Sequence, residues 1–530
     1  MLDVSNNYIK TGRQEFDDLI PAVASFLEAD LLELSVDGQT IRGYRSPDSP
    51  AVWIRDYSDM LRGIRLFEKD VKSTISHFAD NQSANGRIFD FFTTLAEPTP
   101  GTRENWTRYV RVPVEADVEY RFIKAVFLAW QAHGDDAWLE SLLPKCQQAL
   151  EYIFQYPIYY HPDYQLIKRP FTIDTWDFAY TAGSHDWLQF QIDDQTCWGF
   201  FHGDQSGYYE ALKIMEYLYG YFNHPGLRDQ AASQAEVLRT KANQHCWNGN
   251  FYRHFIHLTP CPMEGVNESQ QLSLSNPMDI NRGLTDHNMA VQIIREYLRR
   301  QSNETAFAEW FSIDPPFPDG IFGDQKLKGG IYINGGIFPL AGGELALAAF
   351  NHGFESYGVD ILKKYARLIR KYKGSWLWYF PNGTPSTRES GTSPDATSTD
   401  GWGSTAMLHA LTAGLAGVDD QSKQFHHIRL SPRWLSAGID RAEVQITYAA
   451  TGASLKYLYN YQPGIITLNL EGTESEAVIH LMIPAGIRIQ RVAVNNTPHD
   501  FQLSSIESSR YIDLNIQLSG EAQIRITYTR

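Results

Sequence analysis

Cysteine is scarce in this chain, with four residues in 530, at positions 146, 197, 246 and 261. None of them forms a C-x-x-C pair, and no cysteine or histidine spacing matches a structural zinc site. This scarcity excludes a small disulfide-stapled scaffold. It predicts scattered reduced thiols, which are typical of a cytoplasmic protein.

Positive charge is also in deficit, because Asp and Glu outnumber Lys and Arg and give a formal net charge of −16. A nucleic-acid-binding protein usually carries a basic face that neutralises phosphates, and a membrane-surface protein usually carries a basic cluster. Both classes are disfavoured. No run of about 18 apolar residues is present, which predicts no membrane span. The first ten residues lack an apolar core, so no signal peptide is expected and a cytoplasmic location is predicted.

What the chain does contain is enough apolar material, 43% of residues, for a large core and more than one domain. Aromatic residues reach 13%, including 13 Trp and 29 Tyr. Aromatic faces are good platforms for the C–H faces of sugar rings, although a large helical core also uses many aromatics. A carbohydrate is therefore one candidate partner.

Helical periodicity dominates the first four-fifths of the chain. Apolar residues recur at i, i+3, i+4 and i+7 in segments 12–29, 55–68, 115–133, 136–154, 204–222, 226–245, 283–301, 341–353, 355–372 and 403–416. A largely apolar segment is followed by a more polar one three times: 115–133 then 136–154, 204–222 then 226–245, and 341–353 then 355–372. Alternation of buried and outer helices is what a barrel of helical hairpins requires. Residues 31–46 predict a β-hairpin that turns at Asp37-Gly38.

The pattern changes after about residue 420, where apolar and polar residues alternate with period two between closely spaced turns. This predicts an antiparallel β-sandwich of about eight strands. The predicted architecture is mainly α, a barrel of helical hairpins followed by the sandwich. The predicted domains are an N-terminal helix and hairpin over 1–50, the barrel over 51–419, and the sandwich over 420–530.

Six segments in loops or at the starts of predicted helices contain acids, aromatics or glycines, and functional residues usually lie in loops. They are 52–56 (VWIRD), 112–117 (VPVEAD), 173–178 (IDTWDF), 201–206 (FHGDQS), 329–339 (GGIYINGGIFP) and the long loop 379–402. In the order in which they occur, these segments resemble the motifs of the six-hairpin glycosidases, and this resemblance implies that the barrel is an (α/α)6 barrel. That superfamily includes glucoamylases, glycogen-debranching glucosidases, trehalases and α-L-rhamnosidases. The resemblance covers about residues 50–418, and the sandwich is similar to the one in rhamnosidase-like members.

The resemblance implies that Trp53, Arg55 and Asp56 bind the sugar that is cleaved. A carboxylate accepts two hydroxyl hydrogens, and a neighbouring guanidinium can hold it in place. The alternative is an ion pair that starts a helix. Glu115 or Asp117 has a substrate role or is a first-turn acid that favours the helix dipole.

The resemblance makes Asp177, directly after Trp176, the general acid that protonates the leaving oxygen. Glucoamylases have Glu at this position, so Asp174 remains an alternative. Packing against the neighbouring aromatics would raise the pKa of such an acid by desolvation. The general base is expected in the loop 379–402, and there the candidates are Glu389, Asp395 and Asp400.

The other expected substrate-binding residues lie at the same end of the barrel. His202 and Asp204 precede a buried helix, where Asp204 is also a good N-cap. Tyr332 and Asn334, in the glycine-rich segment, line the barrel end in the superfamily, and Trp402 follows the candidate bases.

These expectations define an exo-acting, inverting glycoside hydrolase that cleaves a short oligosaccharide or small glycoside. The motifs favour an α-glucoside first and an α-L-rhamnoside second. The alternatives are an inverting disaccharide phosphorylase on the same barrel and a non-catalytic carbohydrate-binding protein. The sequence calls for no metal and no cofactor, and it carries no feature that sets an oligomeric state.

Overall fold

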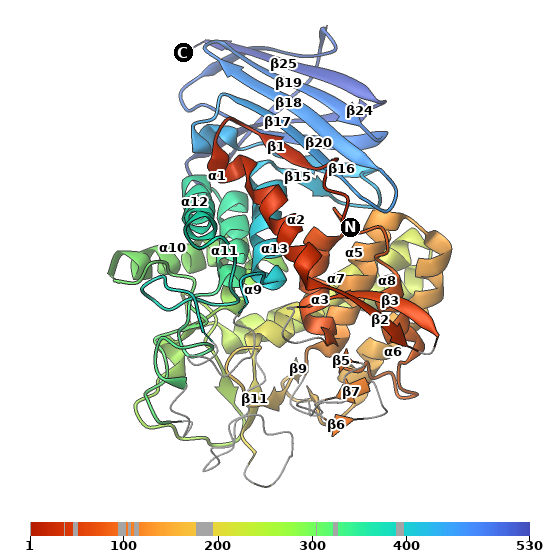
Figure 1. Ribbon diagram of the computed structural model, residues 1–530, viewed down its shortest axis with the longest axis vertical. Coiled ribbons are helices and arrows are strands. Elements are labelled where there is room, and N and C mark those ends of the chain that lie inside the picture. Colours follow the sequence, from red (N-terminus) through yellow and green to blue (C-terminus); the bar gives the residue numbers. More distant parts are fainter. Residues whose placement is uncertain are drawn as a thin grey trace.

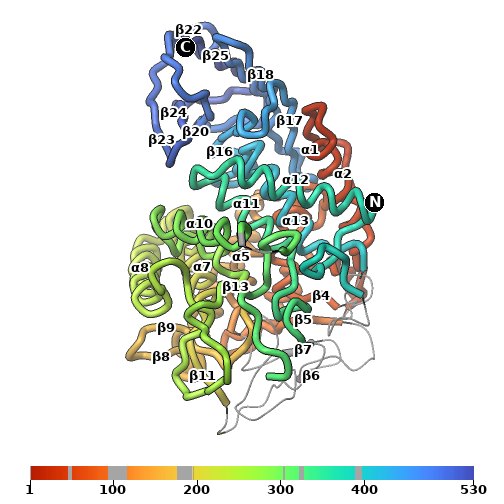
Figure 2. The backbone as a smooth tube through the Cα atoms, turned by 90° about the vertical axis from the view of Figure 1, so that its left-hand side faces the viewer, coloured from red at the N-terminus to blue at the C-terminus, as the bar shows by residue number. Residues whose placement is uncertain are grey.

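The computed structural model describes residues 2–36, 38–45, 51–93, 102–103, 108–110, 116–175, 194, 196–303, 305–321, 327–387 and 397–529. A helical region is packed against two β-sheets, which lie at one end of the molecule (Figure 1). The short strands β5–β7, β9 and β11 lie at the opposite end, and the side view agrees (Figure 2). A single apolar cluster extends through both the helices and the sheets.

Six helices in the described part of the chain contact one another in a closed ring. Each one touches the next in the order given, and the last touches the first. The ring helices are α3 (Ile54–Ile64), α5 (Val118–His133), α7 (His202–Tyr221), α9 (Ser275–Asn281), α11 (Pro339–Asn351) and α13 (Gly401–His409). Their neighbours cover them on most sides, and α3 is buried at every residue.

A second layer of helices packs on this ring. It contains α2 (Leu19–Asp30), α4 (Ser73–Asp80), α6 (Asp136–Gln155), α8 (Pro225–Cys246), α10 (His287–Asn303) and α12 (Glu355–Tyr372). α8 shows why these helices form an outer layer. Only every third or fourth of its residues is buried, so a single stripe of the helix packs on the ring. The predicted pairing of buried and amphipathic helices is confirmed for α5–α6, α7–α8 and α11–α12.

Two ring-region helices were not predicted from the sequence, α4 and α9. Their eight and seven residues span about two turns, which is too short for a reliable helical period. α9 also carries Pro277 in its first turn, a position where proline is tolerated because that N–H has no helical partner. Without α9 the ring would not close between α7 and α11.

The C-terminal region forms two sheets, ordered β1-β17-β18-β19-β25-β21-β22 and β15-β16-β20-β24-β23. Their longer strands are β17 (Arg441–Thr447), β18 (Ser454–Gln462), β19 (Ile465–Gly472), β20 (Ser475–Ile483), β21 (Arg488–Val494), β24 (Ser509–Leu518) and β25 (Glu521–Thr529). Shorter ones are β15 (Val418–Asp420), β16 (His427–Leu430), β22 (Thr497–Pro498) and β23 (Gln502–Ile506). The strands pair antiparallel as predicted, except that β16 and β20 are parallel.

The first sheet also takes a strand from the other end of the chain. β1 (Tyr8–Lys10) pairs antiparallel with β17 and forms one edge. Between this strand and α2 lies the short helix α1 (Gln14–Asp17). The predicted N-terminal hairpin is present as β2 (Leu31–Val36) and β3 (Gln39–Tyr44), which pair in register.

Short strands connect the helices at the end remote from the large sheets. β4 (Val52–Trp53), β5 (Phe91–Phe92), β7 (Arg108–Val110) and β6 (Thr102–Arg103) form one small sheet. β10 (Arg169–Pro170), β11 (Trp198–Phe200) and β12 (Ile256–His257) form a second. Two further pairs are β8 (Tyr160–His161) with β9 (Leu166–Ile167), and β13 (Leu272–Ser273) with β14 (Ile313–Asp314).

The prediction of four reduced thiols is wrong for two of them. Cys197 and Cys261 form a disulfide with their Cα atoms 5.9 Å apart. Cys197 directly precedes β11, and Cys261 follows β12, which pairs with β11. This tertiary pairing joins residues 64 positions apart, and no local sequence spacing reports it. Cys146 and Cys246 are buried free cysteines, as expected.

Candidate active site

The ring helices begin at a common end, the one remote from the two large sheets. Arg55 in the first turn of α3 pairs with Asp117 at the N-cap of α5. Likewise, Gly203 at the start of α7 lies against Ser275 at the start of α9. Several helix N-termini therefore face one region, and their dipoles favour negative charge there. Asp56, Asp117 and Asp204 lie at the N-caps or in the first turns of three of these helices.

The VWIRD segment forms the start of α3, but its Arg and Asp have different partners. Asp56 accepts a hydrogen bond from Arg45 at 2.7 Å between Oδ1 and Nη1. No described residue hydrogen-bonds its second oxygen. Arg55 instead forms an ion pair with Asp117, with Nη2–Oδ1 at 3.1 Å and Nε–Oδ2 at 3.0 Å. The guanidinium expected beside Asp56 is therefore that of Arg45.

Asp117 is the most heavily paired of these acids. It is fully buried, accepts a hydrogen bond from the hydroxyl of Thr175 at 2.8 Å, and lies 3.8 Å from Arg121. Burial alone would raise its pKa, but the charges of Arg55, Arg169 and Arg121 outweigh burial and lower the pKa. Asp117 is therefore a carboxylate that organises cations at the helix ends.

The IDTWDF segment begins at this cluster. Thr175, which directly precedes Trp176, is the residue that binds Asp117. Asp174 uses its carboxylate differently, because it accepts hydrogen bonds from Ser275 Oγ at 2.6 Å and Ser275 N at 3.1 Å. The same carboxylate also accepts a hydrogen bond from the N–H of the next residue, Thr175, at 2.6 Å. These bonds give Asp174 a role in fixing the turn.

A second buried acid–arginine pair adjoins the first. Asp204, in the first turn of α7, accepts from Arg169 at 3.1 Å, and neither side chain is exposed. Burial raises the pKa of Asp204 to about 6, and Asp117 adds to the rise while Arg169 opposes it. Arg169 precedes the IDTWDF segment by a few residues, so it ties the start of that segment to α7.

A deeper layer of charge follows along the ring axis. Asp59 on α3 pairs with Arg121 on α5 and accepts a hydrogen bond from Trp402 Nε1 at 3.0 Å. Arg62 pairs with Glu344, and the distance between Nη1 and Oε1 is 2.5 Å. These groups come from α3, α5, α11 and α13. The ring interior is therefore polar, which suits a polar ligand better than an apolar one.

Four predicted residues have structural partners near this region. His202 is fully buried between Asp279, 2.5 Å from Nδ1, and Ser273, 3.0 Å from Nε2. The side-chain amide of Asn334 hydrogen-bonds the backbone. Its Oδ1 accepts from the N–H of residue 317, and its Nδ2 donates to the carbonyls of residues 317 and 327. Asp400 is the N-cap of α13, where it accepts from the N–H of residue 403. Trp53 stacks on Phe91 with ring centroids 3.9 Å apart.

Tyr332 lies in the same glycine-rich segment as Asn334 and has a backbone φ of 49°. It is buried against Trp378 and Phe338, and its carbonyl accepts a hydrogen bond from Ser312 Oγ at 3.1 Å. The segment is therefore a closely packed turn next to α11. The remaining predicted site residues lie outside the described residues: Glu115, Trp176, Asp177, Glu389 and Asp395.

The sequence did not single out several residues that the structure brings to the site. They are Arg45, Asp59, Arg121, Arg169 and His254. Arg169 had a local clue, because it lies a few residues before the IDTWDF segment. Arg45 and His254 had none, since their contacts with Asp56 and Asp174 depend on how distant segments are packed.

Within the described ranges, no group of three or more His, Cys, Asp or Glu side chains is arranged to hold a metal ion. Among the same residues, no helix has both the length and the apolar character needed to cross a membrane.

No family model matches the chain, and no curated protein matches its sequence. Solved structures do match. An α-L-rhamnosidase from Dictyoglumus thermophilum superposes with a TM-score of 0.62 at 12% identity, over 99% of this chain and 51% of that protein. The GH78 family rhamnosidase of Bacillus sp. GL1 gives 0.60 at 14% identity, over 90% and 43%. The GH63 mannosylglycerate hydrolase from Thermus thermophilus gives 0.52 at 11%, over 74% and 99%.

The chain thus spans about half, or less, of the length of the two rhamnosidases, and nearly all of the shorter hydrolase. At these identities the likeness concerns the fold. This likeness of fold to glycoside hydrolases supports the resemblance that the sequence motifs indicated.

Proposed function

We propose that the protein is an exo-acting, inverting glycoside hydrolase with its active site at the common end of the ring helices. In this proposal the ring α3-α5-α7-α9-α11-α13 is the inner layer of an (α/α)6 barrel. The fold likeness to three glycoside hydrolases supports it. The paired acids and arginines at the helix ends support it independently, because sugar hydroxyls are bound by such charge-assisted hydrogen bonds.

The observation that carries the proposal is the contact of Thr175 with Asp117. It joins the IDTWDF segment to the VWIRD segment, through Arg55, across more than 100 residues of sequence. The segment proposed to carry the acid therefore starts beside the residues proposed to bind the sugar. Hydrolysis needs both functions at one place.

In the proposed mechanism, Asp177 protonates the glycosidic oxygen while Glu389 activates a water on the opposite face of the sugar. An inverting pair needs its carboxyl groups about 6.5–9.5 Å apart to leave room for that water. Asp395 remains the alternative base. Asp174 and Asp400 are less suited to acid–base chemistry, because Asp174 is bonded to Ser275 and Asp400 caps a helix.

Asp56 is the residue proposed to hold the terminal sugar. Arg45 orients its carboxylate by a hydrogen bond, and no described residue donates to its second oxygen. A pair of sugar hydroxyls can donate to such a carboxylate. Trp53, held by Phe91, would offer a nearby aromatic face.

For the substrate, the motifs favoured an α-glucoside, whereas the fold likeness supports an α-L-rhamnoside. The rhamnosidase matches include the C-terminal sheets, since they cover 90–99% of this chain. The match to the mannosylglycerate hydrolase covers 74% of this chain. We therefore place the α-L-rhamnoside first and the α-glucoside second.

A panel of aryl glycosides and disaccharides, with and without inorganic phosphate, tests the proposal. Hydrolysis of an α-L-rhamnoside with release of the inverted anomer, followed by NMR, is the expected result. Turnover that requires phosphate would identify the phosphorylase instead. Sugar binding without turnover of any substrate would favour the carbohydrate-binding alternative.

The acid assignment is tested by Asp177→Asn, with Asp174→Asn as the matched variant. Loss of a general acid typically lowers kcat by about 10²–10⁴-fold, and substrate binding is expected to persist. Asp174→Asn should mainly lower the melting temperature, because it weakens the bonds to Ser275. The reverse pattern would assign the acid to Asp174, and wild-type activity of Asp177→Asn would remove the assignment.

A further inference from the structure

The turn that leads to Trp176 is held by a histidine from elsewhere in the chain. Asp174 has a backbone φ of 51°, in the left-handed region that non-glycine residues seldom adopt. Its peptide N–H donates to Nε2 of His254 at 2.9 Å, and both residues are buried. The unusual conformation is therefore tied to a partner 80 residues away.

This hydrogen bond determines where the ring proton of His254 lies. Nε2 accepts, so it carries no proton, and the proton of the neutral imidazole is on Nδ1. Nδ1 faces Oε1 of Glu268 at 3.3 Å, and that carboxylate can accept the proton's hydrogen bond. Glu268 thus selects the tautomer that Asp174 needs.

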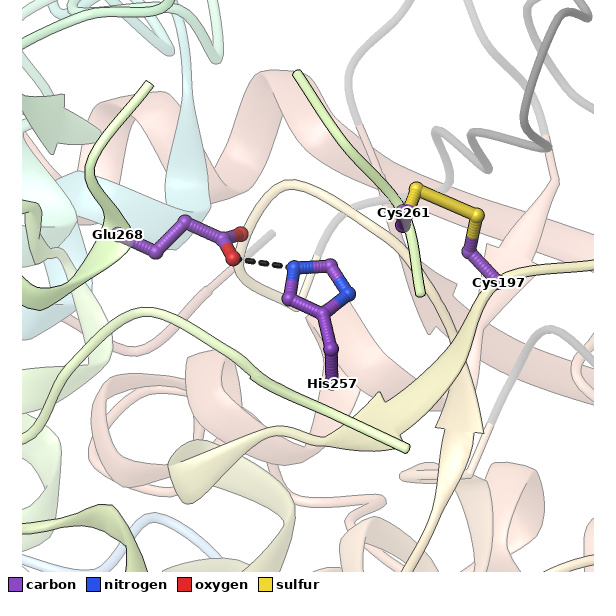
Figure 3. The surroundings of a disulfide bond; sticks show 4 residues. All are labelled: Cys197, His257, Cys261 and Glu268. Atoms are coloured by element: carbon purple, nitrogen blue, oxygen red, sulfur yellow. Dashed lines mark hydrogen bonds and ion pairs between the residues drawn. A yellow bond between two sulfur atoms is a disulfide. The ribbon is translucent and has the colours of Figure 1, made fainter. Parts of the chain in front are cut away.

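Glu268 is itself fixed by a second histidine. Its other oxygen binds Nε2 of His257, beside the disulfide between Cys197 and Cys261 (Figure 3). Burial favours a higher pKa for Glu268, but the hydrogen bonds from His254 and His257 outweigh burial and lower it. The acceptor for His254 is therefore a carboxylate.

The surroundings of His254 leave it little freedom. Phe171 and Phe317 meet its ring edge-on, with centroids 5.7 and 5.8 Å away. On the far side of the turn, Ser275 binds the Asp174 carboxylate, and Thr175 continues to Asp117 and Arg55. A continuous series of contacts therefore connects Glu268 to Arg55 at the start of α3.

We propose that His254 is a positioning residue of the candidate active site. It holds the Asp174–Thr175 turn by accepting the Asp174 N–H, and Glu268 keeps it in the accepting tautomer. This anchors the start of the segment that carries Asp177. The inference rests on the proposed function for its catalytic consequence, but the anchoring itself does not.

Two variants separate the two hydrogen bonds of His254. In His254→Gln the side-chain carbonyl reaches the position of Nε2 and can still accept from Asp174. In His254→Asn the amide reaches only the position of Nδ1, so it can still donate to Glu268 but not accept from Asp174. The pair is matched in polarity and in loss of the aromatic ring.

We expect kcat to depend on whether residue 254 can still accept the hydrogen bond from the Asp174 N–H. His254→Gln should keep kcat within a few-fold, whereas His254→Asn should lower kcat by about 10²-fold, with KM nearly unchanged because the sugar-binding groups are untouched. A side chain that only fills space would give equal losses in both variants. Equal losses, or normal kcat in His254→Asn, would overturn the proposal.

Hydrogen–deuterium exchange, read to single residues by fragmentation, gives a measurement independent of activity. The Asp174 amide should be protected in the wild-type protein and in His254→Gln, and should exchange faster in His254→Asn. Rapid exchange in the folded wild-type protein would refute the anchoring without any variant. Protection together with a failed glycoside panel would instead refute the proposed function.

Discussion

At the scale of single residues, Arg55 and Asp56 show how adjacent side chains acquire different roles. Consecutive residues on a helix point about 100° apart, so the two cannot share a partner easily. Arg55 turns toward Asp117 and Asp56 toward Arg45. Both side chains are almost fully buried, with 6% of Arg55 and 7% of Asp56 exposed. They differ in pairing, because Arg55 makes two contacts with Asp117, whereas no described residue hydrogen-bonds the second oxygen of Asp56. Asp56 is therefore the residue that we propose holds a sugar.

Glu119 is a buried acid whose surroundings do not offset the effect of burial on its pKa. It lies in the first turn of α5 and accepts the N–H of Ile88 at 3.2 Å. Burial raises its pKa to about 8, and the hydrogen bonds to its carboxylate and the charge of Arg87 only partly oppose the rise. Glu119 is therefore protonated in the folded protein near neutral pH.

Replacement of this acid by its neutral isostere should change the pH dependence of stability. Because the folded-state pKa of Glu119 is raised, its contribution is fully present below the unfolded pKa of 4.5 and is lost as pH rises towards 8. Relative to Glu119→Gln, the wild-type protein should lose about 1.4 kcal/mol of unfolding free energy per pH unit in that window.

Melting temperatures of the two proteins across pH 4–9 measure this difference. The curves should coincide below about pH 4.5 and diverge above it, with the variant the more stable. Parallel curves throughout the range would show that Glu119 ionises normally in the folded protein.

At the scale of elements, the disulfide links two paired strands, β11 and β12, and β11 also frames the IDTWDF segment. β10 and β11 pair antiparallel, and the chain between them contains the IDTWDF segment. The N–H of Phe171 donates to the carbonyl of Cys197 at 2.7 Å, so the chain between these two residues begins and ends at neighbouring points. Cys261 locks this arrangement to β12.

Removal of the disulfide should therefore destabilise the protein. A bridge that closes a loop of about this length contributes roughly 4 kcal/mol through the entropy of the unfolded chain. Reductant should lower the melting temperature of the wild-type protein. It should leave the Cys197→Ala/Cys261→Ala variant, which already melts lower, unchanged.

Thiol titration provides the check on this interpretation. The denatured, unreduced protein should show two reactive thiols, from Cys146 and Cys246, and four after reduction. Four thiols before reduction would restore the original prediction from the sequence.

At the scale of the whole molecule, one asparagine joins three distant parts of the chain. Asn7 is buried, and its Nδ2 donates to the carbonyls of Leu66, at the end of α3, and of Thr447, on β17. Its Oδ1 accepts the N–H of Thr447 at 2.7 Å. The N-terminal strand, the helical ring and the first sheet thus meet at a single side chain.

Asn7→Ala should be clearly destabilising, because each buried polar group that it leaves unpaired costs about 1–3 kcal/mol. Asn6→Ala is the matched control, since the Asn6 side chain is exposed and Thr447 uses only its carbonyl. Calorimetry should show a lower melting temperature for Asn7→Ala alone. Equal melting temperatures for the two variants would exclude the bridging role.

Much of this architecture was already present in the sequence, because helical and strand periodicity are local properties. The long helix α7 was predicted with nearly its observed bounds, and antiparallel strands after residue 420 were predicted from their alternation. α9 was missed because two turns carry too little periodicity, although the ring does not close without it. The acidic segments at the helix starts were also identified from the sequence.

The tertiary structure decided which partners these segments have. Arg45 with Asp56, Arg55 with Asp117, His254 with Asp174 and Cys197 with Cys261 join residues 11 to 80 positions apart. Such pairs form only when the ring closes and brings separate helix ends together. The sequence by itself determined where the acids lie along the chain. The packing of the ring determined which of them are neutralised by arginine, which are bound within a turn, and which remain available to a ligand.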